Sequence, residues 1–478
     1  MASEWMLIHG GTVVRGDGSP PEATAVLVHG DRIAAVGEGA TADAVPRGEP
    51  LKRLDATGRT VMPGLVDAHC HMTYGESLTS EEIDLYTSVE SRTLIAAWNM
   101  QKVLRAGVTA ISQPGGSFYI GVGLREGVRA GIVNGPRMWT AGRYITTSNG
   151  LSDPYPEAVG VPESGLGVLA NTLAEMREQV RLQVKNGVDF IKLADSPYGQ
   201  WQAFSDDELK SITDLTHQLR RKITIHARGS DEVRASVRAG VDWIMHGNHM
   251  SDDVIDELAA SRIPLVPTLL LIANLADFAH VCGVPPRLRD GCRRVMEQSA
   301  PVLHKAHEAG VVFVAGTDSG FGVTPYGEWH ARELQLLVEY AGLSPLEAIT
   351  AGTKAAAPMA GLEGEAGELA PGMLADLIVV HGDPVADIGV LTDKRNIETV
   401  VLGGRVVEFP AELDAVHHTN ESARTYSRRI LTYRDVEESR GASEDRGTGD
   451  LPWTRQEGRE LASELRAQEM GARIVAPG

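Results

Sequence analysis

The stretch VMPGLVDAHCH, residues 61–71, is the part of the chain from which the fold is interpreted. An apolar run ends in two histidines, His69 and His71, separated by one residue. Residues i and i+2 of a β-strand point to the same side, so we expect the two imidazoles together at the carboxyl end of a buried strand. Neutral imidazole is the commonest side-chain metal ligand. Two histidines with ordinary hydrogen bonds are the alternative, and this pair alone does not decide between them.

The composition predicts a soluble globular protein that does not bind polyanions. The 478 residues carry 45 Lys and Arg against 64 Asp and Glu, a net charge of −19, which argues against nucleic acid or an anionic membrane as a partner. Three cysteines are no disulfide framework. The start of the chain lacks a signal-peptide pattern, and no apolar run reaches the ~20 residues that span a bilayer. We therefore expect a cytoplasmic protein with a small-molecule substrate, and a homo-oligomer.

Two kinds of sequence pattern divide the chain. Residues 5–60 and 366–409 read as short strands with turn residues between them, which predicts one composite β domain. Between them, strand-like runs alternate with amphipathic helical segments, at residues 173–185, 206–219 and 252–260 among others. With the strand before His69, the expected strands number eight, the count of a TIM barrel. They lie at residues 108–112, 137–141, 190–194, 223–227, 243–246, 265–269 and 311–315.

The predicted fold is therefore α/β: a (β/α)8 TIM barrel with a small composite β-sandwich domain and a C-terminal extension. The expected boundaries are 1–61 and 366–410 for the two parts of the sandwich, 62–365 for the barrel and 411–478 for the extension. Residues 143–170 are rich in Ser, Thr, Gly, Asn and Pro, which predicts a long loop over the barrel mouth. The polar extension, with expected helices near 420–438 and 455–470, is either a solvated appendage or a subunit contact.

Four more candidate ligands follow predicted strands. Lys192 lies inside an apolar run, where an unpaired ammonium is expensive to bury, so either Asp195 neutralises it or it has a special role. His226, His246 and Asp318 end the runs ITIH, WIMH and FVAGTD. Together with His69 and His71 they belong to strand ends of one barrel face, where barrel active sites form.

With these residues in this order, the sequence resembles the amidohydrolase superfamily. The flanking stretches 61–67, 187–192, 316–318 and 369–380 carry the same resemblance, which covers about residues 5–408. The chain is most similar to the imidazolonepropionase-like and prolidase-like branch, and it also resembles hydrolases of phenylurea and thiocarbamate herbicides.

The resemblance implies a binuclear metal centre. His69, His71 and Asp318 would hold one metal, His226 and His246 the second, and a carboxylated Lys192 would bridge them. We expect two divalent ions, zinc before cobalt, manganese or iron. A hydroxide between two metals is nucleophilic at neutral pH. Asp318 would pass its proton to the leaving nitrogen, so Asp318 and Lys192 are the expected catalytic residues.

The resemblance favours hydrolysis of an amide, urea or carbamate over deamination, because His226 is followed by Ala-Arg-Gly and lacks the Glu of deaminases. A dipeptidase or N-acyl amino acid hydrolase, a cyclic-amide hydrolase of the imidazolonepropionase type, and a scaffold without activity are the alternatives.

The expected substrate-binding residues are Asn149, in place of the usual loop His, with Arg228, Tyr198 and Tyr326. Arg228 would bind a carboxylate or form a structural pair with Asp195 or Glu328. Because Asn149 is neutral and Arg228 has these partners, we expect neutral substrates.

Overall fold

Residues 4–416 are described by the computed structural model, and their first and last strands form two antiparallel-rich sheets. One sheet has the order β5 (Arg32–Val36), β4 (Val26–His29), β1 (Trp5–His9), β6 (Leu51–Asp55). The other has the order β19 (Arg405–Val406), β18 (Ile397–Leu402), β17 (Leu377–His381), β7 (Arg59–Pro63), β2 (Thr12–Val13), β3 (Glu22–Ala23). β7 pairs with β17, from Pro63 opposite Leu377 to Arg59 opposite His381, and so joins the two ends of the chain. Apolar residues of both sheets, such as Ile8, Val61 and Val379, share one buried cluster.

The segment between these strands forms a parallel α/β core. One sheet has the order β10 (Arg137–Thr140), β9 (Val108–Gln113), β8 (Leu65–Asp67). The second has the order β12 (Gly167–Leu169), β11 (Tyr144–Thr146), β13 (Phe190–Ala194), β14 (Lys222–Gly229), β15 (Trp243–His249), β16 (Leu265–Val266). All of these pairings are parallel, which requires a crossover between successive strands.

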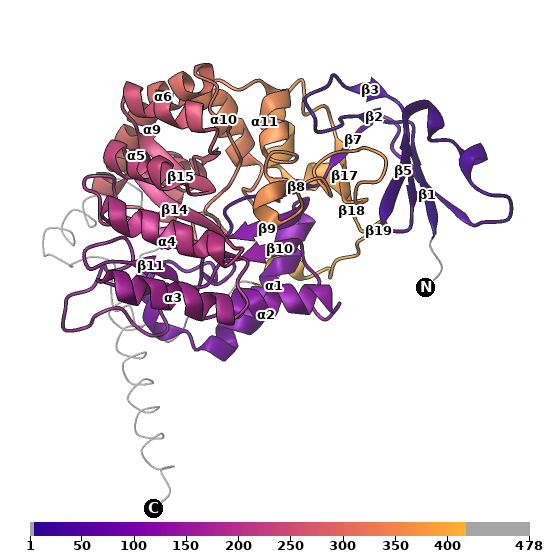
Figure 1. Ribbon diagram of the computed structural model, residues 1–478. Helices are drawn as coiled ribbons and strands as arrows, with labels where there is room; N and C mark the ends of the chain where they lie inside the picture. Colours follow the sequence, from indigo (N-terminus) through magenta and orange to yellow (C-terminus); the bar gives the residue numbers. More distant parts are fainter. Residues whose placement is uncertain (1–3, 417–478) are drawn as a thin grey trace, which may run out of the picture. The chain divides into compact units, whose positions relative to one another are not determined.

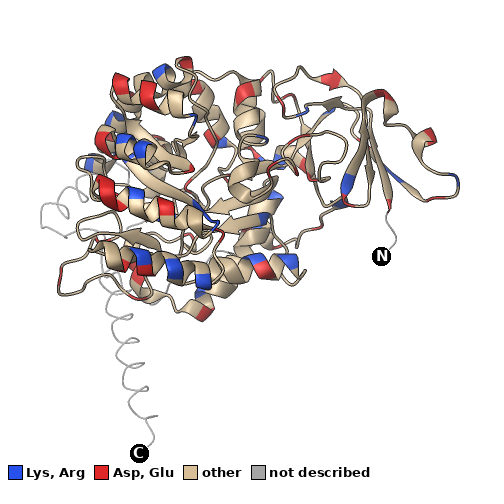
Figure 2. Ribbon diagram, viewed as in Figure 1, with Lys and Arg blue, Asp and Glu red and all other residues tan. Residues whose placement is uncertain are grey.

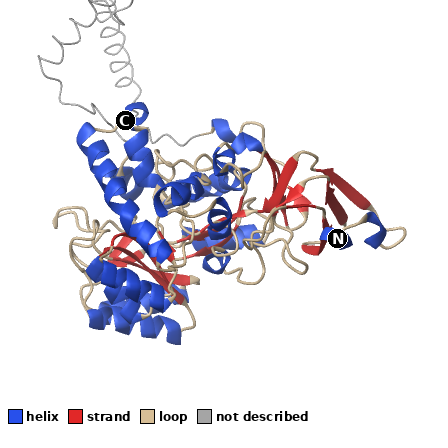
Figure 3. Ribbon diagram, turned by 90° about the horizontal axis from the view of Figure 1, so that it is seen from above, coloured by secondary structure: helices blue, strands red, loops and turns tan. Residues whose placement is uncertain are grey.

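Helices supply the crossovers and flank the parallel strands on the outside (Figures 1 and 3). The main ones are α1 (Val89–Arg105), α2 (Ile120–Arg129), α3 (Leu173–Lys185), α4 (Asp206–Gln218), α5 (Ser230–Ala239), α6 (Asp252–Ser261), α9 (Pro286–Glu308), α10 (Arg332–Ala341) and α11 (Pro345–Ala351). Shorter ones are α7 (Leu270–Asp277), α8 (Ala279–Cys282) and a π-helical turn at Glu82–Tyr86. Basic and acidic residues are mixed along the outer helices (Figure 2). None of the helices described is long and apolar enough to cross a membrane.

The expected helices form because their ends are well capped. At α3 the Thr172 side chain accepts from Glu175 N while the Glu175 side chain accepts from Thr172 N, and Ser205 and Glu208 do the same at α4. α5 ends at Gly240, whose φ of 79° is a left-handed conformation that glycine adopts without strain.

Two expected strands differ from the structure. β16 ends at Val266 because Pro267 has no N–H and Thr268 adopts a φ of 52°. Residues 311–315 form only a single bridge, Phe313 with Leu265, because their hydrogen-bond partners change from one residue to the next. Val314 N donates to Leu265 O, whereas Ala315 N donates to Ala351 O and Ala315 O accepts from Ala68 N.

These irregular hydrogen bonds connect the two parallel sheets, although the strand ladders themselves do not form one closed sheet in the described part of the chain. The 312–319 segment links β16 to the chain after β8, where Asp318 N donates to His69 O over 2.7 Å. At the other edge, Asp189 N donates to Thr140 O over 2.9 Å, next to the change from β10 to β11.

The expected loop 143–170 is largely irregular but contributes the short strands β11 and β12, which the sequence did not predict. The expected helices near 420–438 and 455–470 lie outside the described residues.

Candidate metal centre

All six expected metal ligands line one cavity of about 290 Å³. Lys192 lies in the middle of β13, His226 in the second half of β14 and His246 in the middle of β15. The other three lie on loops: His69 and His71 follow β8, and Asp318 follows the 311–315 segment. The strand placement expected for the two histidines is therefore wrong, because β8 ends at Asp67. Their convergence comes from the turn after the strand.

His69, His71 and Asp318 form the tighter half of the site. The Nε2 atoms of His69 and His71 lie 2.9 Å apart, and Asp318 Oδ1 lies 3.4 Å from His69 Nε2 and 3.2 Å from His71 Nε2. All three side chains are almost fully buried. Asp318 has a φ of 56°, a conformation that is uncommon for a residue other than glycine and that recurs at functional sites. Two imidazole nitrogens and one carboxylate oxygen at this spacing are a donor set for a divalent transition metal.

His226, His246 and Lys192 form the other half. The ring centroids of His226 and His246 are 4.2 Å apart, and that of His246 is 5.5 Å from His69. The Thr268 hydroxyl donates to Pro267 O, so it accepts from Nδ1 of His246 and leaves Nε2 of His246 without a proton. Nδ1 of His71 likewise donates to Gly115 O over 2.9 Å. Both rings are therefore held in a tautomer that leaves Nε2 available as a ligand atom.

Burial favours the neutral forms of three histidines and of Lys192 in this site. It lowers the pKa of His69 to about 4, although Asp318 opposes the shift, and it lowers the pKa of His226 and of His246 well below the usual value. Burial and the charge of Arg228 lower the pKa of Lys192 to about 7, with Asp318 again opposing. Burial tends to raise the pKa of Asp318, but the neighbouring His69 and His71 hold it well below its usual range. Neutral imidazoles and an ionised carboxylate are the protonation states that bind metals.

Polar atoms left without partners fit a metal centre. Nδ1 of His69 and Nε2 of His226 are buried and make no hydrogen bond. Lys192 Nζ contacts the thioether of Met245 rather than Asp195, whose carboxylate accepts from Ser196 N and Ala203 N. The pairing of Lys192 with Asp195 is therefore not the one in the structure. Buried polar groups without partners are rare and call for an explanation, and two metals with a carboxylated Lys192 would supply one.

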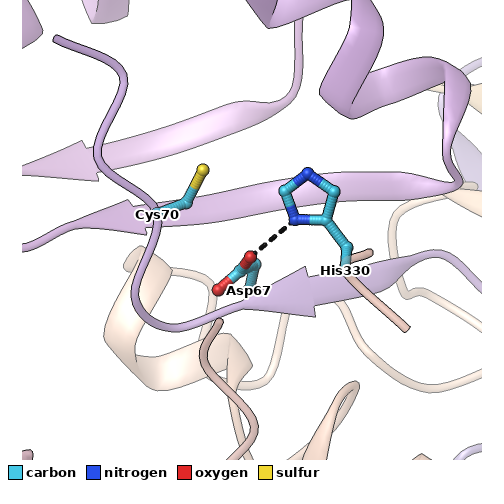
Figure 4. Close-up of side chains that lie close together, drawn as sticks. All are labelled: Asp67, Cys70 and His330. Carbon is cyan, nitrogen blue, oxygen red and sulfur yellow. Dashed lines mark hydrogen bonds and ion pairs between the residues drawn. The ribbon is translucent and has the colours of Figure 1, made fainter. Parts of the chain in front are cut away.

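Asp67, Cys70 and His330 form a second cluster of possible ligands (Figure 4). His330 Nδ1 donates to Asp67 Oδ2 over 2.8 Å, while His330 Nε2 accepts from Gly327 N over 3.1 Å. Both ring nitrogens are thus used, so this cluster is a hydrogen-bond network rather than a ligand set. Asp67 also accepts from His69 N and Thr317 N, each over 3.0 Å, and from the Thr317 hydroxyl. It ties the His69 turn to the Asp318 turn.

Of the expected substrate-binding residues, Arg228 and Tyr198 line the cavity, and Asn149 and Tyr326 do not. Asn149 is exposed on a turn whose backbone N–H donates to Asp153. The buried Tyr326 hydroxyl donates to His71 O and accepts from Gly75 N, and so braces the His71 turn.

The expected partners of Arg228 are also wrong. Its guanidinium donates to the Asn248 side-chain oxygen, and no carboxylate of residues 4–416 forms an ion pair with it. Glu328 pairs with Lys394 instead, over 2.7 Å. Nε of Arg228 is buried without a hydrogen-bond partner. A half-buried guanidinium therefore lines the cavity, with the neutral Asn248 as its side-chain hydrogen-bond partner.

Sequence reasoning missed two tyrosines and an acid of the cavity wall, Tyr74, Tyr144 and Asp84. Tyr74 stacks on His71, with ring centroids 4.2 Å apart and an interplanar angle of 8°. Its place three residues after His71 is the only local signal. Tyr144 and Asp84 lie in segments without periodicity, so no sequence pattern marks them.

Comparison with known proteins places the chain in a family. The model of the amidohydrolase family matches residues 60–407. Ochratoxinase from Aspergillus niger is 26% identical over 434 residues, covering 84% of this chain and 87% of that protein. A crystal structure of a prolidase complexed with N-methylphosphonate-L-proline matches with a TM-score of 0.75 at 25% identity, over 84% of this chain and 99% of that one. The structure of molinate hydrolase matches with a TM-score of 0.71 at 22% identity, over 90% and 100% of the two chains.

The family and the prolidase-like neighbours imply a TIM-barrel fold for the parallel α/β core. The match to molinate hydrolase bears on the fold alone. The family match covers every one of the six cavity residues described above as ligands. The chain is a hydrolase and belongs to the amidohydrolase family.

Proposed function

We propose that the protein hydrolyses an amide-type C–N bond of a small molecule with two bound divalent metal ions. His69, His71 and Asp318 would hold one ion, His226 and His246 the other, and Lys192, carboxylated on Nζ, would bridge them. The ions would polarise the scissile carbonyl and lower the pKa of water. A Lys pKa near 7 supports carboxylation, because only the neutral amine reacts with carbon dioxide. Zinc suits four imidazoles and carboxylate oxygens.

The chain's own residues move the proton. Asp318 is ionised and buried beside His69 and His71, so its carboxylate accepts a proton from the attacking water. It then passes this proton to the leaving nitrogen. Water is thereby added across the C–N bond, and an amide gives a carboxylic acid and an amine. The apolar cavity wall, with Ile83, Leu271 and Phe321, excludes other water and strengthens these electrostatic interactions.

The proposal for the substrate class rests on Arg228. We propose that the substrate bears a carboxylate that Arg228 binds. A guanidinium keeps its charge in a half-buried position, and a partly desolvated charge without a hydrogen-bonded ion pair is costly. A substrate carboxylate would supply the missing partner with two parallel hydrogen bonds. This replaces the expectation of neutral substrates, since Asn149 is exposed outside the cavity lining and no carboxylate of residues 4–416 forms an ion pair with Arg228. The N-methylphosphonate-L-proline complex of the prolidase relative is consistent with it.

The test is a panel of matched compounds: N-acetyl-L-phenylalanine, glycyl-L-proline and N-carbamoyl-L-phenylalanine, each with its C-terminal methylamide. Wild-type enzyme should hydrolyse the acids in preference to the methylamides. Arg228→Met should raise KM for the acids about 100-fold, because losing a charged pair costs ~3 kcal/mol, and should leave KM for the methylamides unchanged.

Arg143→Met is the matched control. Arg143 is also half-buried, but it donates to Pro162 O and Gly167 O and does not line the cavity. Its loss should not discriminate between acids and methylamides. Faster hydrolysis of the methylamides by wild-type enzyme would contradict the carboxylate proposal, and neutral ureas and carbamates would become the favoured class. Absence of bound metal would contradict the whole proposal.

The division into domains is also proposed. Residues 1–61 and 366–410 would form one β-sandwich and residues 62–365 the catalytic barrel. The pairing of β7 with β17 and the cluster shared by both sheets support it.

A further inference from the structure

Two tyrosine hydroxyls meet beside His71 at the cavity wall. Tyr74 Oη and Tyr144 Oη are 2.5 Å apart, and both side chains are buried. Tyr144 Oη lies 3.1 Å from Nδ1 and 3.3 Å from Nε2 of His71. Gly115 makes this placement possible, because a Cβ at Gly115 would collide with the Tyr144 ring. The pair is therefore rigid and next to a proposed metal ligand.

The surrounding hydrogen bonds restrict where the protons of the Tyr74 and Tyr144 hydroxyls can lie. A carbonyl oxygen only accepts, so the contact of His71 Nδ1 with Gly115 O requires the proton on Nδ1. His71 Nδ1 therefore cannot accept from Tyr144, and Nε2 cannot either when it binds a metal. Two hydroxyls carry two protons, and only one of them lies between the two oxygens. The second has no other acceptor among the hydrogen bonds of the described residues, and it is left at the cavity surface.

We propose that Tyr144 is a catalytic residue that donates this hydrogen bond to the substrate's carbonyl oxygen as negative charge develops on it. Tyr74 would be its positioning residue: with Tyr74 as the donor of the bond between the two hydroxyls, the Tyr144 proton is free and its direction is fixed. This inference rests on the proposed amide hydrolysis. Asn149, the residue expected to supply such a donor, is exposed outside the cavity, and Tyr144 supplies it from the adjacent strand β11. Donors placed for a developing oxyanion act on the transition state more than on the bound substrate.

The test uses the metal-loaded full chain and the variants Tyr144→Phe, Tyr74→Phe and Tyr119→Phe. Tyr119 is a partly buried control outside the cavity. With the best acid of the panel, Tyr144→Phe should lower kcat about 100-fold at an almost unchanged KM, in line with the loss of one oxyanion donor. Tyr74→Phe should lower kcat by roughly 10-fold, since it removes the orienting bond and leaves the donor. Tyr119→Phe should match wild type.

Two further measurements separate this inference from the proposed function. The metal content of every variant should equal that of wild type, which excludes loss of the centre as the cause. Methylphosphonate, a small tetrahedral anion, should bind Tyr144→Phe at least 10-fold more weakly than wild type by calorimetry. Equal kcat, or equal methylphosphonate affinity, in Tyr144→Phe and wild type would overturn the role of Tyr144. If wild type hydrolyses no compound of the panel, the proposed function fails, and the methylphosphonate comparison alone decides on Tyr144.

Discussion

Asp67→Asn tests how the metal ligands are positioned. Asp67 is buried and accepts four hydrogen bonds, two from backbone N–H groups at Oδ1 and two from Thr317 Oγ1 and His330 Nδ1 at Oδ2. Asparagine can accept at only one of these atoms. The Thr317 hydroxyl can turn to Ser319, which lies 2.7 Å away, but His330 cannot move its proton to Nε2 because Nε2 accepts from Gly327 N. At least one buried donor loses a charged acceptor, a cost of about 3 kcal/mol.

The expected result is a loss of both stability and metal affinity. The free energy of unfolding, from urea denaturation of chelator-treated protein, should fall by about 3 kcal/mol. Zinc affinity, from competition with a fluorescent chelator, should fall 10- to 100-fold, because the His69 and Asp318 turns are no longer held together.

Asp376→Asn is the matched control, since Asp376 is equally buried and accepts from Arg137 and Gly403 N at the start of β17, away from the cavity. It should lose comparable stability and keep wild-type zinc affinity. If Asp67→Asn also keeps wild-type zinc affinity, the positioning argument is refuted.

The remaining predictions concern single residues. Lys192→Ala should bind fewer than two metal ions per chain and lose most activity, as measured by elemental analysis and turnover; full metal content with full turnover would contradict the binuclear centre. Asp318→Asn should keep its circular dichroism spectrum while kcat falls at least 1,000-fold, and wild-type turnover would rule out its proton transfer. Burial raises the pKa of Glu333 to about 8, although it accepts from Leu269 N and Leu270 N. The folded state therefore holds this proton more tightly than the unfolded chain, and its contribution to stability is full below pH 4.5 and lost as the pH rises toward 8. The stability difference between chelator-treated wild type and Glu333→Gln should accordingly fall by up to ~1.4 kcal/mol per pH unit between pH 6 and 8, and a constant difference would contradict the raised pKa.

Residues next to regular strands could be identified from the sequence. Lys192 lies inside an apolar run and His226 and His246 end two others, and parallel pairing brings corresponding positions of neighbouring strands together. The residues on irregular loops could not be placed in the same way. Asn149 was expected in the cavity and is exposed, and Tyr144 was not considered although it lines the cavity. A loop has no periodicity from which the direction of a side chain follows.

The sequence by itself determined the α/β class of fold and the order of the expected metal ligands, because both depend on short-range patterns: alternating strands and helices, capped helix ends and histidines after buried runs. Only the tertiary structure decided which groups those donors meet. Asp67 contacts Thr317, 250 residues further along the chain, and the absence of an ion pair to the Arg228 guanidinium within residues 4–416 depends on everything packed around it. Such contacts depend on how distant elements pack, which no local pattern encodes. The substrate class proposed here therefore follows from the structure rather than from the sequence.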